Sequence, residues 1–392
     1  MNSNIKVSVS NFLGGYLVEN NSDSEFPSLD IKEENNASWQ ANTAYVNKKY
    51  PGPVAAGILF SIATMFLTYG GVLLPFENKY LKSGLGEVIF VLLPVLVFLI
   101  VGKYNIKDTL KLRRTRPINY LIIVFLTMFA MPVVGVLNLL VLGLIRLVFG
   151  KNLPIDQILI PDIPTLFIAI LVIGVSAAVC EETLFRGLIS KGYDRFGVIA
   201  SLVITSVLFG ILHRDIQKGV STILLGALIG YIVYRTKSIY SGMVAHFTNN
   251  TVAVILTYWT AEMSERLGKT GYEQAQNLDF SNIPTVSLVI AIIIYAIAFL
   301  AFVAVFIVLL YVFYRSTQKD NQSKTLPVQF HLESEAEQTI LKSPQSKFSL
   351  AGLIAVLPGV IIILLIFVGQ ILELMNVNSG VLYDLLKMLW LK

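Results

Sequence analysis

From about residue 50 onward, the sequence consists mainly of long apolar runs separated by short polar blocks. A helix needs roughly 20 apolar residues to span the hydrocarbon of a bilayer. Only 14% of the residues are charged, against about 25% in a soluble domain. The sequence therefore predicts an all-α fold, a polytopic membrane helix bundle of about 8–9 transmembrane helices. The predicted spans are 54–76, 85–102, 121–145, 165–190, 198–212, 220–234, 239–259, 286–314 and 350–372.

Two features of these spans leave the topology open. The third span carries Pro132 in its interior, so it could be one helix or two half-spans. The spans at 198–212 and 220–234 are short for crossing a bilayer. The predicted organisation is a polar, flexible tail without a cleavable signal peptide (1–50), N-terminal membrane helices (51–150), a membrane core that holds most of the ionisable residues found inside spans (151–260), an outer loop and long helix (261–314), a polar loop (315–348), and a last helix with an amphipathic tail (349–392).

Charge placement predicts the orientation. The loop at 103–116 holds six Lys and Arg residues against a single acidic residue, Asp108. By the positive-inside rule this loop, and with it the N-terminus, is expected on the cytoplasmic side of the cell membrane. The same rule explains the net charge of +5 without a nucleic-acid partner. One cysteine, Cys180, excludes a disulfide scaffold.

Ionisable side chains inside apolar spans are costly, about 2.5–3.5 kcal/mol each at mid-bilayer. The fourth span contains Glu181, Glu182 and Arg186. Glu182 and Arg186 are four residues apart, so they share a helix face and can form an ion pair that only locks helices together. Glu181 points about 100° away and is expected to face a cavity.

Two further spans carry polar groups at helical spacing. Phe209 and His213 lie one turn apart at the end of the fifth span, and Gly210 allows another helix to approach closely. In the seventh span, His246 and Asn250 are four residues apart on one face. A single histidine at a helix end is commonly interfacial, so His213 taken alone is a weak signal.

One carboxylate, two histidines and an amide in one cavity make a hydrolytic set. Glutamate with histidine can hold a water molecule and take its proton, and histidine with asparagine can donate hydrogen bonds to an oxyanion. Alternatively, Glu181, His213 and His246 are a plausible zinc ligand set with water in the open position. The residues alone leave both mechanisms open, so the cofactor is unknown and zinc is one candidate.

These motifs resemble those of the CAAX prenyl protease and bacteriocin-processing family, also called CPBP or Abi, of intramembrane proteases. Its marks are Glu-Glu-x-x-x-Arg, Phe-x-x-x-His and His-x-x-x-Asn, which stand here at 181–186, 209–213 and 246–250. The resemblance covers about residues 165–255. It implies an all-helical membrane enzyme that cleaves a peptide bond near or within the bilayer. By this resemblance Glu181 and His213 would activate water, His246 and Asn250 would stabilise the oxyanion, and Glu182 and Arg186 would hold the shape of the site.

The favoured hypothesis is therefore an intramembrane endopeptidase, metal-assisted or not, that acts on a membrane-associated or lipidated peptide or protein. The alternative is a non-catalytic immunity or regulatory membrane protein of the same fold that binds a peptide or partner. A transporter with a Glu–His proton relay is a third hypothesis. The absence of repeated halves in the sequence disfavours it.

Overall fold

The computed structural model describes residues 49–154, 159–276, 285–323 and 350–377, together with four positions near the C-terminus. Every regular element in these ranges is helical, and they contain no strand. The elements are α2 (Pro53–Tyr69), η1 (Gly70–Leu73), α3 (Lys79–Gly86), η2 (Glu87–Leu92), α4 (Leu93–Val101), α5 (Ile106–Thr109), α6 (Pro117–Phe149), α7 (Ile163–Ala169), η3 (Ile170–Ser176), α8 (Ala177–Glu182), η4 (Thr183–Ile189), α9 (Ser190–Tyr193), η5 (Asp194–Phe196), α10 (Val198–Leu212), α11 (Gly219–Thr236), α12 (Ile239–Gln276), α13 (Thr285–Ser323) and α15 (Leu350–Leu374).

Seven continuous helical stretches in the described part are long and apolar enough to cross a membrane. They are Pro53–Leu73, Lys79–Val101, Pro117–Phe149, Ile163–Phe196, Gly219–Thr236, Thr285–Gln318 and Leu350–Leu374. The helix α10 is apolar but shorter. The helix α12 is long, but His246 and the asparagines beside it lower its hydropathy. With these two, the helices correspond to the nine predicted spans, and the chain is a polytopic helical membrane protein.

The third span is one helix. α6 runs without a break through Pro132, so the alternative of two half-spans is wrong. A proline is tolerated inside a membrane helix because neighbouring groups and small local adjustments satisfy the backbone group that it frees.

Two predicted loops are partly helical. The segment expected as an outer loop from 260 continues α12 to Gln276, and the polar loop expected from 315 begins as the last turns of α13. In the first case Glu262 and Arg266 form an ion pair of 2.8 Å at helical spacing, among residues with high helix propensity. In the second, Arg235 donates to the hydroxyl of Thr317 at 2.9 Å.

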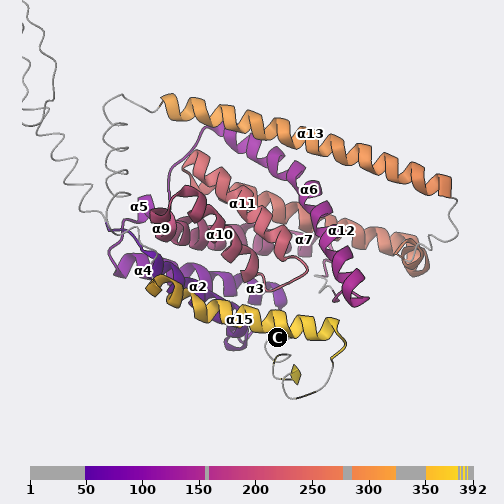
Figure 1. Cartoon of the computed structure of the whole chain (residues 1–392), viewed down its shortest axis with the longest axis horizontal. Helices are drawn as coiled ribbons and strands as arrows, with labels where there is room; N and C mark the ends of the chain where they lie inside the picture. Colours follow the sequence, from indigo (N-terminus) through magenta and orange to yellow (C-terminus); the bar gives the residue numbers. More distant parts are fainter. Residues whose placement is uncertain are drawn as a thin grey trace, which may run out of the picture. The chain divides into compact units, whose positions relative to one another are not determined.

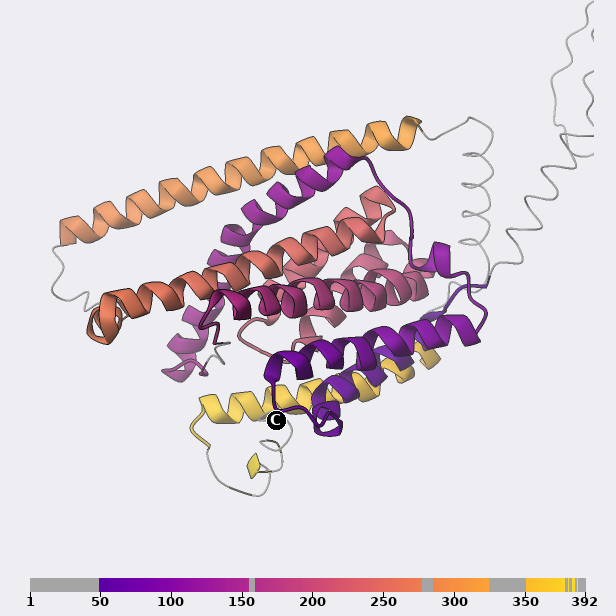
Figure 2. The same cartoon turned by 180° about the vertical axis from the view of Figure 1, so that it is seen from behind.

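The helices pack as neighbours that are far apart in the sequence. α15 lies along α2, and α13 lies along α6 (Figure 1). The same pairs are seen from behind in Figure 2. α10 packs against α11, while α12 contacts α6, α11, η3 and α8. The helix from Ile163 to Tyr193 lies among these elements, and every residue from 181 to 189 is buried. A helix segment buried on all sides is held from all sides, which suits a segment that carries a polar site.

This central helix changes its winding around the two glutamates. The π-helical segments η3 and η4 flank the six α-helical residues of α8. Such π-helical insertions are rare and are frequently found at functional sites. The predictions for the tail at 1–48, for 324–348, for most of 378–392 and for His331 lie outside the described residues.

Candidate active site

The most buried polar network joins the fourth and seventh spans. Arg186 donates from Nη1 to Oε1 of Glu182 at 2.9 Å, which is the predicted ion pair. His246 places Nδ1 at 2.9 Å from the same oxygen. The exposed fractions are 0% for Glu182 and 2% for each of the other two. Arg186 also donates to the carbonyl oxygen of Gly226 at 2.8 Å. Sequence analysis predicted Arg186 as the partner of Glu182. It did not predict that His246 would be a second partner of the same carboxylate.

Two glycines allow the helices to come this close. A Cβ on Gly242, one turn before His246, would stand 2.9 Å from Oε2 of Glu182 and 2.6 Å from Val233. A Cβ on Gly210 would stand 2.2 Å from the side chain of Ile223. The close approach predicted at Gly210 is therefore confirmed, and α11 is the helix that approaches.

Phe209 lies at the centre of the candidate site. Its ring is fully buried and makes edge contacts with both imidazoles, at centroid distances of 5.0 Å to His213 and 5.7 Å to His246. The guanidinium of Arg186 lies 4.4 Å from the same ring. The two histidines come from different helices, α10 and α12, and both imidazoles contact the same aromatic ring. His213, which was a weak signal in the sequence, therefore lies in the same cluster as His246.

Each imidazole is held through Nδ1 by an acceptor. For His246 the acceptor is the Glu182 carboxylate, and for His213 it is the backbone carbonyl of Phe209, both at 2.9 Å. Carboxylate and carbonyl oxygens accept hydrogen bonds, so Nδ1 is the donor in both rings and Nε2 is left for chemistry. A carboxylate stabilises an imidazolium more than a carbonyl does. The acceptor of His246 is therefore a charged group, whereas that of His213 is a neutral one.

Glu181 is a buried carboxylate of the central helix. It is 8% exposed, and its Oε2 is buried without a hydrogen-bond partner in the described part of the chain. Glu87, on η2, also has a buried Oε2 without a partner there, and its charge interacts with those of Glu181 and Arg214. Sequence analysis missed Glu87, although one carboxylate inside an apolar span is the signal that could have found it.

Asn250 makes an interhelical contact. Its Nδ2 donates to the carbonyl of Ile173 in η3 at 2.8 Å, and its Oδ1 accepts from Asn249 at 3.0 Å. An amide NH₂ carries two hydrogens, so this contact leaves one donor for another acceptor. The predicted shared face of His246 and Asn250 follows from the unbroken helix α12.

Zinc binding by Glu181, His213 and His246 stays a prediction. Among the described residues, no group of three or more His, Cys, Asp and Glu side chains is placed to hold a metal ion. One carboxylate of the region, Glu182, is already shared by Arg186 and His246.

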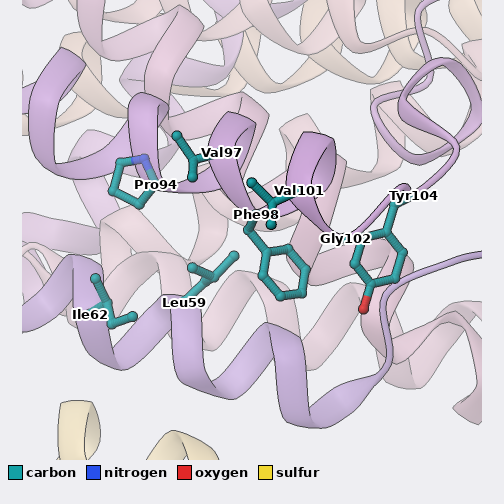
Figure 3. Close-up of a pocket in the computed structure, with 8 residues that line it drawn as sticks. All are labelled: Leu59, Ile62, Pro94, Val97, Phe98, Val101, Gly102 and Tyr104. Carbon is teal, nitrogen blue, oxygen red and sulfur yellow. The ribbon is translucent and has the colours of Figure 1, made fainter.

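An apolar pocket of about 460 Å³ lies elsewhere, between α2 and α4. Figure 3 shows Phe98 and Tyr104 at one end and Leu59 and Ile62 on the facing helix. Its lining offers no titratable group apart from the Tyr104 phenol. It carries none of the predicted site residues, so it adds nothing to the hydrolytic chemistry.

Comparison with known proteins agrees with this geometry. Residues 163–252 match the family model described as "Type II CAAX prenyl endopeptidase Rce1-like". The chain is 25% identical over 224 residues to "Putative membrane peptidase YdiL" of Bacillus subtilis, which covers 56% of this chain and 88% of that protein. No solved structure gives a significant match. Residues 163–252 are thus similar to the Rce1-like family of CAAX prenyl endopeptidases, and this similarity supports an intramembrane protease at the level of that family.

Proposed function

We propose that this protein is an intramembrane endopeptidase that hydrolyses a peptide bond in a membrane-associated or lipidated peptide or protein. The observation that carries the proposal is the pair of histidines around Phe209, which are held through Nδ1 by two different acceptors. In the proposed hydrolysis one imidazole accepts a hydrogen bond from water, and the other, when it carries both ring protons, donates one to the oxyanion.

The proposed reaction begins with a water molecule beside Glu181 and His213. As the water oxygen bonds to the scissile carbonyl carbon, Glu181 takes the proton, and Nε2 of His213 accepts a hydrogen bond from the same water. His246 and Asn250 donate hydrogen bonds to the oxyanion that forms. The C–N bond then breaks, and the proton passes from Glu181 to the leaving amine. Glu182 and Arg186 keep His246 in place.

Zinc stays a prediction that metal analysis tests. Purified protein that holds about one zinc per chain and loses activity reversibly when the metal is removed would confirm the zinc prediction. Full activity in a metal-free sample would favour the Glu–His mechanism. The cytoplasmic position of the N-terminus and of the loop at 103–116 in the cell membrane is likewise proposed from the positive-inside rule.

The decisive experiment compares membrane peptides in cells that carry the wild type or Glu181→Ala. Peptides that accumulate only with the variant are candidate substrates, and purified wild-type protein should cleave them. We expect Glu181→Ala to lower turnover about 10²–10⁴-fold, because it removes the group that takes the proton of water. Its folded yield should remain near that of the wild type.

The matched control is Glu77→Ala, which removes an exposed carboxylate outside the helices. It should leave turnover unchanged. If the wild type binds such a peptide and never cleaves it, the alternative of a non-catalytic immunity or regulatory protein is correct.

A further inference from the structure

A buried glutamine of the last helix holds the backbone next to His213. Gln370, on α15, is 5% exposed. Its Nε2 donates to the carbonyl of Arg214 at 2.7 Å, and its Oε1 accepts from the backbone N–H of Ile216 at 3.0 Å. Both ends of one side chain thus bind the loop that connects α10 to α11. Polar side chains inside membrane helices seldom persist without a role.

The same loop is held from a second helix. Arg214 donates from Nη1 to the carbonyl of Leu67 at 2.8 Å and to the hydroxyl of Thr68 at 3.2 Å, both near the end of α2. Its φ of 55° lies in the left-handed region, which costs a non-glycine residue about 1–2 kcal/mol. Such a conformation persists where the surroundings over-determine it. Contacts from α2 and α15 supply that constraint here.

The position of His213 depends on this backbone. His213 is the residue immediately before Arg214, and its own side chain is exposed. The only hydrogen bond of its ring among the described residues goes to Phe209, one turn earlier on the same helix. That bond cannot fix the ring relative to the other helices of the site. The loop that follows can, because helices outside residues 163–252 hold it.

We propose that Gln370 is a positioning residue of the hydrolytic site, which fixes His213 by binding the backbone on its C-terminal side. The expected effect on turnover rests on the proposed function, in which His213 takes part in hydrolysis. The expected effect on the position of His213 does not. A glutamine that binds both a donor and an acceptor of one loop restricts the loop in two directions. Its loss leaves a half-buried N–H and a half-buried C=O without this partner.

The experiment is ¹⁵N NMR of the histidine side chains in the full chain in detergent. The chain has three histidines, and histidine variants assign their signals. Gln370→Met keeps the side-chain length and removes both hydrogen bonds. We expect the His213 signal to shift or broaden and the His246 signal to stay. Turnover should fall about tenfold with KM unchanged, since a small misplacement of a catalytic group is costly.

Ser61→Ala is the matched control. Ser61 also ties α2 to α15, through Ala355 at 2.9 Å and Gly359 at 3.1 Å, but it does not touch the loop. It should leave the His213 signal in place. Thr68→Val, which removes one contact of Arg214, is the milder second variant. It should move the His213 signal in the same direction by a smaller amount.

The inference is wrong if the His213 signal moves in neither Gln370→Met nor Thr68→Val. It is also wrong if the His246 signal changes as much as the His213 signal, because an equal change would show a general structural role. If the His213 signal moves while turnover remains normal, Gln370 does position His213, but the proposed part of His213 in hydrolysis is wrong.

Discussion

The two histidines of the site are held in contrasting ways. His246 is buried, and its partner is a carboxylate that also binds Arg186. His213 is exposed, and its partner is a carbonyl of its own helix. The first is fixed by side chains from two spans, the second by the backbone around it. The two imidazoles therefore differ both in burial and in the charge of the group that holds them.

The two histidines also differ in which part of the chain holds them in place. Glu182, Arg186 and Gly226 all lie within residues 163–252, the segment shared with the Rce1-like family. The loop after His213 is held by Gln370 and by the end of α2, both outside that segment. The helices beyond the family core therefore support the more exposed half of the site.

The largest expected effect comes from breaking the buried half. Glu182→Gln leaves the charge of Arg186 without its counterion, and breaking a buried pair in this way costs about 3–5 kcal/mol. His213→Gln, at an exposed position, should cost less than about 1 kcal/mol. Thermal unfolding in detergent, followed by the folded fraction, measures both. Equal losses in the two variants would contradict the contrast.

Asn250 should give the next largest effect. Its hydrogen bond to Ile173 is an interhelical contact, and such bonds are worth about 0.6 kcal/mol on average. An oxyanion donor is worth about 10²–10³ in turnover. We expect Asn250→Ala to lower turnover at least roughly tenfold with thermal stability nearly unchanged. Asn249→Ala, whose amide donates to Asn250, is the control and should have a much smaller effect. Normal turnover in Asn250→Ala would leave Asn250 as a packing residue only.

Much of this architecture could be predicted from the sequence, because apolar length and helical spacing act locally. The nine spans and the Glu182–Arg186 pair follow from those rules. The helical ends of α12 and α13 were missed because their polar residues were interpreted as loop. Polarity alone does not distinguish an exposed helix from a loop.

The contacts of the site between distant segments could not be predicted. The contact between Glu182 and His246 joins residues that are 64 positions apart. The contact between Gln370 and Arg214 joins residues that are 156 positions apart. No spacing rule connects such positions, since helix packing decides which faces meet. Glu87 was missed for a different reason. It is one carboxylate in an otherwise apolar span, and it acquires significance only beside Glu181.

The smallest expected effect concerns Lys111, which lies outside residues 163–252. It supports the buried half of the site, formed by Glu182, Arg186 and His246. Lys111, in the loop before α6, donates from Nζ to the carbonyl of Arg186 at 2.6 Å and to the hydroxyl of Ser190 at 3.2 Å. Burial lowers the pKa of Lys111 from its ordinary value of 10.5 to about 8, although Asp194 acts in the opposite direction. Below about pH 8 Lys111 is therefore charged in both the folded and the unfolded state. The charge has a higher free energy in the folded protein than in the unfolded chain.

The sign of the pH dependence follows from proton counting. Between the folded pKa of about 8 and the ordinary value of 10.5, the unfolded chain binds more protons than the folded one, so stability rises with pH. Lys111→Met removes this term. We expect the melting temperature of the wild type to rise relative to that of the variant from about pH 7.5 to about pH 9.5. Lys107→Met, at an exposed lysine of the same loop, should show no such trend. A constant difference between wild type and Lys111→Met across this range would mean that the pKa of Lys111 is not lowered in the folded protein, and that the lysine stays charged there as it does in the unfolded chain.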